Sequence, residues 1–383
     1  MVSYRGGHME TKPVLYHLGK FPPKELDWPK LIPLIGPASA GLARYDGLLS
    51  AIPNADVLLS PLTTQEAVLS AKIEGTRVTI GEVLEIEAGG ESEAFTQTKR
   101  DEAEEVLNYR SAMLACVKEM ERRPLSQQLL RTAHGMLMQG VRGQDKSPGR
   151  YRTEQNWIGS KGCSIGEASF VPVPPEHLMA GMDAWENYLS STPASDILVQ
   201  LAILHVEFEA LHPFMDGNGR LGRMLIPLFM YQRKLLTRPD FYMSGYLEIN
   251  REEYQEKLRA VSRDGAWTDW CVFFLQGVKE QAAENASKAQ AILALYDRVK
   301  ELAVDLTRSQ HAIRAVDFMF KTPIFSTPAF TIFSGIPKAT ANRILPILRD
   351  GGILHTIREG RGSRPGLYIF RELLNIAEGK EAF

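Results

Sequence analysis

Cysteine is scarce in this chain of 383 residues, which has only Cys116, Cys163 and Cys271. The three lie far apart in the sequence and show no Cys-x-x-Cys spacing, which argues against a disulfide framework or a zinc cluster. So few cysteines are typical of a reducing compartment, and we expect a cytoplasmic protein.

Long apolar runs and an excess of basic charge are missing as well. No stretch approaches the roughly 18 apolar residues that span a bilayer, and the first residues, MVSYRGGHMETKP, lack the apolar run of a signal peptide. We therefore expect no membrane partner. Lys and Arg number 44 against 46 Asp and Glu, a net charge of -2, so no overall basic field marks a nucleic-acid binder.

What remains is the pattern of a mainly α-helical protein. Residues 1–60 mix proline-rich turns with short helical patches. Thr63 and Glu66 have the spacing of a capping box, which predicts a helix that begins at Thr63 and stops at Gly75. Further helical patterns cover about 97–121, 126–140, 176–190, 195–211, 217–234, 251–261 and 267–303. Residues 156–158 and 169–171 read as two short strands joined by a glycine-rich turn, a β-hairpin signal.

The tail, residues 306–383, resembles a winged-helix domain. Helices are expected near 309–320 and 327–333, and a candidate recognition helix over 339–349. A two-stranded wing would span 354–357 and 366–369.

The residues that carry chemistry lie between two helices, in the segment His212-Pro-Phe-Met-Asp-Gly-Asn-Gly-Arg-Leu-Gly-Arg223. A glycine-rich loop that opens a helix points free backbone N–H groups at one place, which favours an anion. Arg220 and Arg223 are three residues apart and can cover the same face, as suits a polyphosphate. Asp216 can hold Mg²⁺, and His212 can accept a proton from an attacking hydroxyl. Taken singly each residue would more often be structural, but the combination predicts phosphoryl or nucleotidyl transfer.

This segment resembles the signature of Fic-domain proteins, His-x-Phe-x-(Asp/Glu)-Gly-Asn-Gly-Arg-x-x-Arg, at every specified position. The stretch LARYDGLLSAIPNADVLLSPLTTQEAVLSAKIEGTRVT is similar to the N-terminal region of many bacterial members, and the hairpin and the tail resemble the family's flap and its frequent winged helix. The resemblance implies a Fic helical core over 116–305, an N-terminal helical regulatory region over 1–115 and a winged-helix domain over 306–383.

The resemblance also implies an activity, transfer of AMP from Mg-ATP to a Ser, Thr or Tyr hydroxyl of a target protein or of the enzyme itself. His212 would be the general base and Asp216 the Mg²⁺ ligand. The anion hole would be formed by Gly217, Asn218 and Gly219. Arg220 would contact the phosphate chain and Arg223 the γ-phosphate.

The flap and the adenine side are carried over in the same way. Ile158 and Gly159 would border the nucleotide, and the flap's strand edge would hold the target backbone by strand addition. Tyr254 lies where the family places an adenine-side aromatic residue. Many members have Tyr-Tyr there, whereas this chain has Tyr254-Gln255.

A second motif predicts a switch. Ser70-Ala-Lys-Ile-Glu74-Gly75 is similar to the family's inhibitory pattern, (Ser/Thr)-x-x-x-Glu-(Gly/Asn). Ser70 and Glu74 are one helical turn apart, so Glu74 can pair with Arg223 if that helix packs on the site. Paired in this way, Arg223 would not grip the γ-phosphate, and the enzyme would be autoinhibited.

Alternatives stay open at this stage. The donor could be UTP, GTP or CDP-choline instead of ATP, and Glu74 could support removal of AMP. The protein could also be a DNA-binding regulator, because residues 338–371 carry seven Lys or Arg against two acids, a net of +5. The chain could also form a homodimer.

Overall fold

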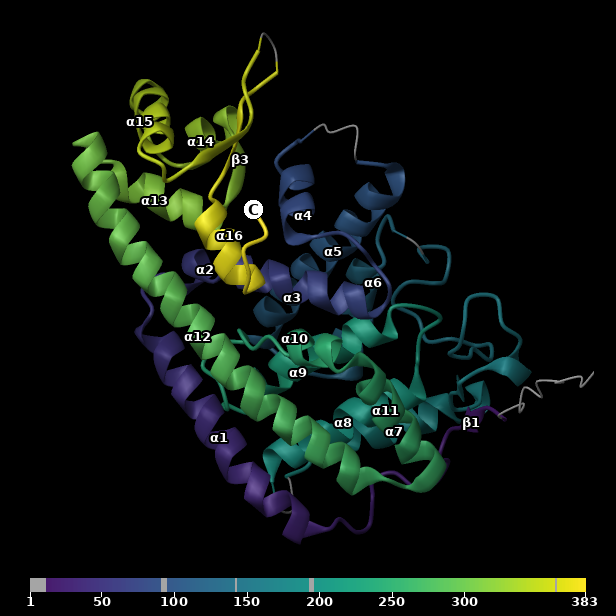
Figure 1. The fold of residues 1–383 in the computed structure, drawn as a ribbon. Coiled ribbons are helices and arrows are strands. Elements are labelled where there is room, and N and C mark those ends of the chain that lie inside the picture. The colour runs from purple at the N-terminus through teal and green to yellow at the C-terminus, as the bar shows by residue number, and fades with distance from the viewer. Residues whose placement is uncertain (1–11, 91–94, 142, 193–195, 362–363) are drawn as a thin grey trace, which may run out of the picture.

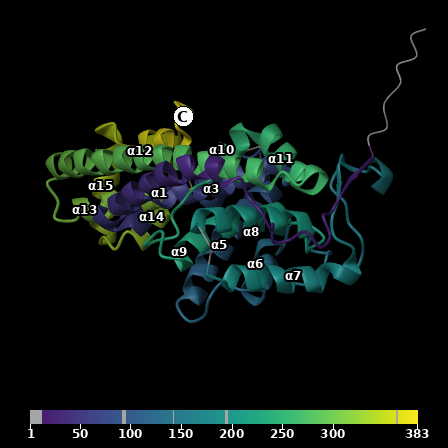
Figure 2. The ribbon, with the colours of Figure 1, turned by 90° about the horizontal axis from the view of Figure 1, so that it is seen from below.

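The computed structural model describes residues 12–90, 95–141, 143–192, 196–361 and 364–383, and these residues form a mainly helical protein. The expectation that the chain begins without a signal peptide concerns residues 1–11, which lie outside the described residues. The longest element is α12 (Trp267–Thr307), with 41 residues. It runs along one side of the molecule, and α1 (Trp28–Ala51) lies beside it (Figures 1 and 2). The predicted fold class, mainly helical with small sheets, is confirmed.

The remaining elements follow in chain order. Before residue 125 the helices are α2 (Ala55–Leu58), α3 (Ser60–Ile73), α4 (Ile80–Glu87) and α5 (Gln97–Met120). The middle of the chain contains α6 (Gln127–Leu137), a 3-10 turn at Ile165–Glu167, α7 (Pro175–Ser190), α8 (Ile197–Leu211), α9 (Asn218–Gln232), α10 (Ser244–Ile249) and α11 (Arg251–Asp264).

Helix α8 forms the centre of the core. Its sequence, ILVQLAILHVEFEAL, is apolar on every face apart from a few polar residues, and nearly all of it is buried. A helix that is apolar all round belongs in the interior. It packs against α7, α9, α11 and α12, and these neighbours fix the place where α8 ends and the motif loop begins.

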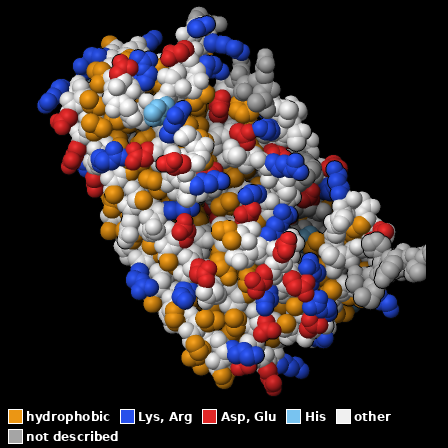
Figure 3. All heavy atoms as spheres, in the orientation of Figure 1, with side chains coloured by type: hydrophobic (Ala, Val, Ile, Leu, Met, Phe, Trp, Pro, Cys, Tyr) orange, Lys and Arg blue, Asp and Glu red, His pale blue; other side chains and the backbone are white. Residues whose placement is uncertain are grey.

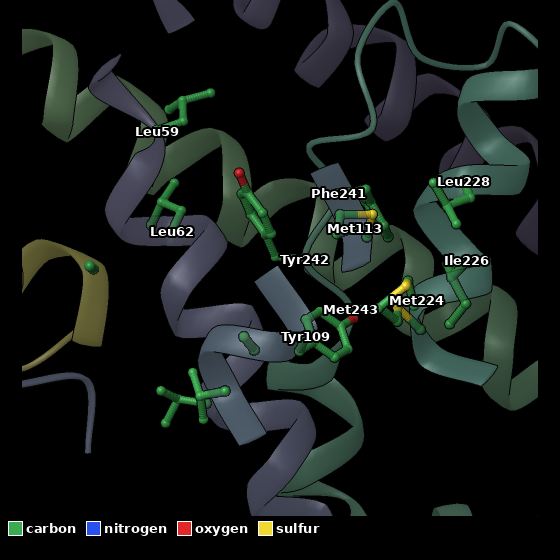
Figure 4. Close-up of a cluster of buried hydrophobic side chains, with 14 of the residues drawn as sticks. Leu59, Leu62, Tyr109, Met113, Met224, Ile226, Leu228, Phe241, Tyr242 and Met243 are labelled. Atoms are coloured by element: carbon green, nitrogen blue, oxygen red, sulfur yellow. The ribbon is translucent and has the colours of Figure 1, made fainter. Parts of the chain in front are cut away.

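A cluster of buried side chains joins α3 to the core (Figure 4). Because α3 packs against both α5 and α9 there, the burial of these side chains fixes the position of α3 relative to α9, the helix that begins within the 212–223 motif. The cluster contains Leu59, Leu62, Tyr109, Met113, Met224, Ile226, Leu228, Phe241, Tyr242 and Met243.

Helix α1 differs from the short helical patches expected among the prolines. It is one helix of 24 residues, with Pro29 in its first turn and Pro33 and Pro37 inside. Proline is tolerated in a first turn, whereas an interior proline removes a backbone hydrogen bond. Packing along α12 offsets that loss through a buried stripe that contains Leu31, Ala38, Leu42, Tyr45 and Leu49.

The predicted capping box at the start of α3 is wrong. The helix begins at Ser60, with Pro61 in its first turn, so Thr63 lies inside it. Glu66 does not turn back to cap the helix, because its buried carboxylate accepts hydrogen bonds from the backbone N–H of Ser244 at 3.0 Å and from the Ser244 hydroxyl at 2.6 Å. A tertiary contact has replaced the local one.

The predicted hairpin is present only in part. Ile158 forms a single antiparallel bridge with Phe170, and the second strand is β2 (Phe170–Val171). The partner strand of β2 is β1 (Val14–Leu15), which pairs with it in parallel. We call residues 156–171 the flap.

The tail has elements where the winged-helix prediction placed them (Figure 1). The predicted elements are α13 (Ala312–Lys321), α14 (Thr327–Phe333), α15 (Lys338–Asp350), β4 (His355–Arg358) and β5 (Leu367–Ile369). Two further elements, β3 (Ile324–Ser326) and α16 (Arg371–Glu378), were not predicted. The strands form an antiparallel sheet in the order β3-β5-β4.

Helices cross or approach both predicted domain boundaries. Helix α5 runs through residue 115 and α12 through residue 305. Neither boundary coincides with the end of a helix, and the division into 1–115, 116–305 and 306–383 stays a prediction.

None of the described helices is both long enough and apolar enough to cross a membrane. Basic and acidic side chains are interspersed over the face shown in Figure 3.

Candidate active site

The motif loop connects the end of α8 to the start of α9. His212 follows the last turn of α8 in the left-handed region, at φ 48°, and Gly217 precedes α9 at φ 77°. The first-turn N–H groups of α9 have no partner within the helix, and the helix dipole adds partial positive charge there. The end of one helix thus carries His212 while the start of the next provides an anion site.

Side chains from inside and outside the motif hold this loop in place. Asn218 accepts a hydrogen bond from the N–H of Phe214 and donates one to the Phe214 carbonyl, both at 2.8 Å. Gly149 N–H donates to His134 Nδ1 at 2.8 Å, so Nε2 of this imidazole carries the proton and donates to the Asp216 carbonyl at 2.9 Å. The Asn218 side chain is therefore occupied, and only its backbone N–H is available to an anion.

Arg152 is a supporting residue that the sequence analysis missed. Its guanidinium is 4 % exposed and donates to the backbone carbonyls of His212 at 3.0 Å, Leu211 at 3.3 Å and Glu154 at 3.1 Å, and also to that of Val173. The planar fork of arginine satisfies carbonyls that the end of α8 leaves free. Nothing in the motif indicates this residue, because its contacts with the motif side go to backbone carbonyls, those of His212 and Leu211, about 60 positions away.

The His212 side chain is suited to accept a proton. Its Nδ1 lies 3.3 Å from the Glu209 carbonyl, which can only accept, so Nδ1 carries the proton and Nε2 keeps its lone pair. Burial lowers the pKa of His212 to about 4, although the carboxylates of Glu74 and Asp216 oppose that shift. The imidazole is therefore neutral near pH 7.

Arg220 is held by a carboxylate from outside the motif. Its Nη1 donates to Glu105 Oε2 on α5 at 3.0 Å, and both side chains are buried. Its Nη2 lies 3.8 Å from Asp216 Oδ1. Glu105 was also missed, because it lies 115 residues before its partner.

Arg223 donates through Nε and Nη2 to α3, the helix that carries Ser70 and ends at Glu74. Its Nε donates to the Ser70 hydroxyl at 2.9 Å, and its Nη2 donates to the Ser70 carbonyl at 2.8 Å and to Glu74 Oε1 at 2.7 Å. Glu74 is the residue at which α3 ends, and Gly75 follows at φ 98°. The predicted contact between Glu74 and Arg223 is present.

Glu74 also lies at the start of α9. A Cβ added to Gly219 would meet Glu74 Oε1 at 2.2 Å, so this carboxylate lies against the first turn. Burial raises the pKa of Glu74, but the charge of Arg223 and its hydrogen bond outweigh burial and hold that pKa below its ordinary value. An ionised carboxylate therefore occupies the place that the helix start makes favourable for an anion.

These residues surround a cavity of about 720 Å³. Ile158 and Gly159 of the flap line it, as predicted, and α11 contributes Tyr254 and Gln255. The cavity wall also includes Glu74, Trp157, Ser160, Phe170, Val206, Glu209, Ala210, His212, Asp216, Gly219, Arg223, Leu258 and Arg259. The structure thus brings most of the predicted site residues to one cavity, whereas Ser70, Gly217, Asn218 and Arg220 support it from behind.

The α11 side of the cavity has two features that the sequence did not indicate. Tyr254 is 2 % exposed, and its hydroxyl lies 2.9 Å from Nε2 of the buried His205. Glu209, which the sequence analysis did not single out, has a buried Oε1 that accepts no hydrogen bond from the described residues. Burial raises its pKa to about 7, against the opposing charge of Arg223.

The donor set fits Mg²⁺ delivered with a nucleotide. Asp216 is 32 % exposed, and its Oδ1 accepts a hydrogen bond from Gly217 N–H at 2.7 Å. Mg²⁺ is commonly bound through one or two carboxylates plus substrate phosphates and water. Within the described residues, no group of three or more His, Cys, Asp or Glu side chains is placed to hold a metal ion. A metal at Asp216 would take its other ligands from phosphate and water.

Two profiles of one protein family match the sequence. Residues 32–118 match the Fic/DOC family N-terminal profile, and residues 124–230 match the Fic/DOC family profile. A Fido domain-containing protein of Dictyostelium discoideum is 30% identical over 118 residues, which is 30% of this chain and 73% of that protein. The chain belongs to the Fic/DOC family.

Relatives with a named activity are matched over a smaller part of their length. Protein adenylyltransferase fic-1 of Caenorhabditis briggsae is 35% identical over 106 residues, and a probable protein adenylyltransferase of Aquifex aeolicus is 30% identical over 96 residues. Each match covers 25% of this chain, but only 19% and 30% of the two relatives. This chain thus spans less than a third of their length.

Solved structures agree with the fold. A Fic family protein from Desulfovibrio desulfuricans covers 89% of this chain and 96% of its own, with a TM-score of 0.57 at 19% identity. Caenorhabditis elegans Fic-1 covers 71% of this chain and 75% of its own, with a TM-score of 0.52 at 18% identity. At such identities the likeness extends to the fold alone.

Proposed function

We propose that this chain transfers AMP from Mg-ATP to a Ser, Thr or Tyr hydroxyl of a protein, itself included, and that Glu74 holds this activity back. One observation carries the proposal: the free Nε2 of a neutral His212 shares a cavity with the anion site at the start of α9. The named activity of the adenylyltransferase relatives supports the same chemistry.

Each residue then has a defined part in the transfer. His212 Nε2 takes the proton of the acceptor hydroxyl while that oxygen attacks the α-phosphorus of ATP. The new bond joins the acceptor oxygen to the α-phosphorus, and the bond from the α-phosphorus to the bridging oxygen breaks, so pyrophosphate leaves. The N–H groups at the start of α9 bind phosphate oxygens, and Arg223 binds the γ-phosphate. Asp216 would hold Mg²⁺, which neutralises phosphate charge.

Arg220 acts from one layer further out. Its guanidinium is buried against Glu105 and lies within 4 Å of Asp216 Oδ1. It places positive charge behind the phosphate chain and limits where the Asp216 carboxylate can lie. Glu105 in turn keeps Arg220 from being an unpaired buried charge.

Inhibition follows from where Glu74 lies. Its carboxylate occupies the Arg223 Nη2 that the γ-phosphate needs, and it adds negative charge at the start of α9. Release of Arg223 allows the triphosphate to bind with its α-phosphate in line with the acceptor hydroxyl.

Intact-mass measurement tests the proposal. Glu74→Gly protein incubated with Mg-ATP should gain one or more AMP groups, and Glu74→Gly/His212→Ala protein should gain none. Parallel incubations with UTP, GTP and CDP-choline identify the donor, and incubation of the labelled product without ATP detects removal of AMP. No gain with any of these donors would refute the proposal.

A further inference from the structure

The flap has a strand partner from the other end of the chain. β1 runs parallel to β2, with Val14 N–H donating to the Ser169 carbonyl at 3.4 Å and Tyr16 N–H donating to the Val171 carbonyl at 3.0 Å. Figure 1 shows β1 near α11, which it contacts. One edge of β2 is therefore covered by the protein's own backbone.

The opposite edge of β2 holds Ile158. Ile158 N–H donates to the Phe170 carbonyl at 2.9 Å, and Phe170 N–H donates back at 3.1 Å. The register puts Val14, Phe170 and Ile158 in one row across the strands, and Ile158 and Phe170 face the cavity. Leu15 lies on the other face and is 64 % exposed. β1 thus supports the row of side chains that borders the cavity.

Tyr16 and His17, the two residues that follow β1, both contact Glu207 on α8. The Tyr16 hydroxyl donates to Glu207 Oε1 at 2.6 Å, and His17 Nε2 lies 2.8 Å from Glu207 Oε2. His17 Nδ1 lies 2.7 Å from the Ser262 hydroxyl on α11. Glu207 is fully buried on α8, five residues before His212. Hydrogen bonds to a buried carboxylate are among the strong ones.

From these contacts we propose that residues 14–17 tie the flap to α8, and we call this segment the strap. Tyr16 and His17 are its positioning residues. The strap holds Ile158 and Gly159 over the cavity at a set distance from His212. Since β1 covers one edge of the flap, an acceptor polypeptide that adds as a strand pairs along the Ile158 edge. The acceptor part of this inference rests on the proposed function, whereas the fastening of the flap does not.

Hydrogen exchange tests the fastening directly. In full-length protein, Tyr16→Phe and His17→Ala should speed exchange of the Ile158 and Phe170 amides about tenfold, the effect of losing one charged hydrogen bond. Leu18→Ala is the matched control, because this neighbouring side chain is 55 % exposed. Unchanged exchange in the flap would overturn the strap. Equal acceleration in α9 would show general destabilisation and would overturn it too.

Kinetics test what the strap does for the acceptor. In Glu74→Gly protein, with His212→Ala chains as acceptor, the strap variants should raise KM for the acceptor several-fold and KM for ATP by a smaller factor. Equal changes in both KM values would overturn the positioning role. If Glu74→Gly protein transfers nothing, the proposed function fails, and the exchange rates still decide whether the strap exists.

Discussion

Arg223 and Glu74 are joined by a 2.7 Å ion pair between unequal partners. The Arg223 side chain is 1 % exposed and also donates to Ser70, whereas the Glu74 side chain is 39 % exposed and faces the cavity. We therefore expect that a phosphate can replace Glu74 at Arg223 without moving the arginine. α3 is packed between α5 and α9, so the change needed is confined to the side chain at its end.

Neutralising Glu74 should strengthen nucleotide binding. Its pKa is held below the ordinary value by Arg223, so the carboxylate is charged at neutral pH and repels a triphosphate. Glu74→Gln keeps the shape and removes the charge, and we expect Kd for Mg-ATP to fall roughly tenfold or more. Titration calorimetry measures this. Glu248→Gln is the matched control, because Glu248 pairs with Lys72 beside the same helix end; an equal gain in that variant would contradict a specific role of Glu74.

The pH profile of transfer should lack an acid limb near 6.5. The folded-state pKa of His212 is about 4, so its base form is present above that pH and is lost only as pH falls through about 4. Glu74 raises this pKa, so its removal lowers it further. We expect kcat/KM of Glu74→Gly protein to show no loss from His212 between pH 8 and about 5. An acid limb near 6.5 in this profile would contradict the account if an imidazole titration at the same pH is seen by NMR in Glu74→Gly protein and is missing from Glu74→Gly/His212→Gln protein.

Separating Arg220 from Glu105 should be costly. Both side chains are buried, and removal of one partner leaves a charge without compensation. We expect Glu105→Ala to lower the free energy of unfolding by about 3 kcal/mol or more. Glu105→Ala/Arg220→Ala should cost less than the sum of the single changes, as measured by urea unfolding. Additive losses would show that the two residues do not depend on each other.

Arg152 should not be replaceable by lysine. Its donors reach four backbone carbonyls around the motif loop, and an ammonium group cannot reproduce that planar fork. We expect Arg152→Lys to lower the free energy of unfolding by about 2 kcal/mol and to slow transfer, because His212 loses its fixed position. Arg150→Lys, at an exposed neighbouring position, is the control for both measurements. Similar effects in the two variants would contradict this role.

The sequence indicated the site because its chemistry is contiguous. Residues 212–223 place the predicted base, the predicted metal ligand, the predicted anion cradle and two arginines on one loop and one helix turn. The pairing of Glu74 with Arg223 was also predictable, since a second motif of fixed spacing pointed to it. Helices such as α14 and α15 were placed within a residue or so from the resemblance of the tail to a winged helix.

The supporting contacts could not be predicted in the same way. Glu105 and Arg152 reach the site from other elements, and no local pattern marks them. β1 has two residues and pairs with β2 across more than 150 positions, so it has no usable periodicity and was not predicted. The helix start near Thr63 was misplaced because Glu66 bonds to Ser244, 178 residues away.

The roles of the tail and of a second chain stay predictions. The net charge of +5 over residues 338–371 leaves DNA contact as an alternative function. A salt-dependent gel shift of the full-length protein, compared with an Arg361→Glu/Arg364→Glu variant, tests it. Loss of binding in the variant would support contact through the wing, and equal binding would contradict it.

The central claim is that the cavity at the start of α9 binds the phosphates of ATP in the place where Glu74 now lies. A crystal structure of Glu74→Gly protein with Mg²⁺ and a non-hydrolysable ATP analogue tests it most directly. The account predicts phosphate oxygens on the guanidinium of Arg223 and on the first N–H groups of α9, Mg²⁺ at Asp216, and the α-phosphate within reach of His212. Nucleotide bound elsewhere, with Arg223 free of phosphate, would contradict it.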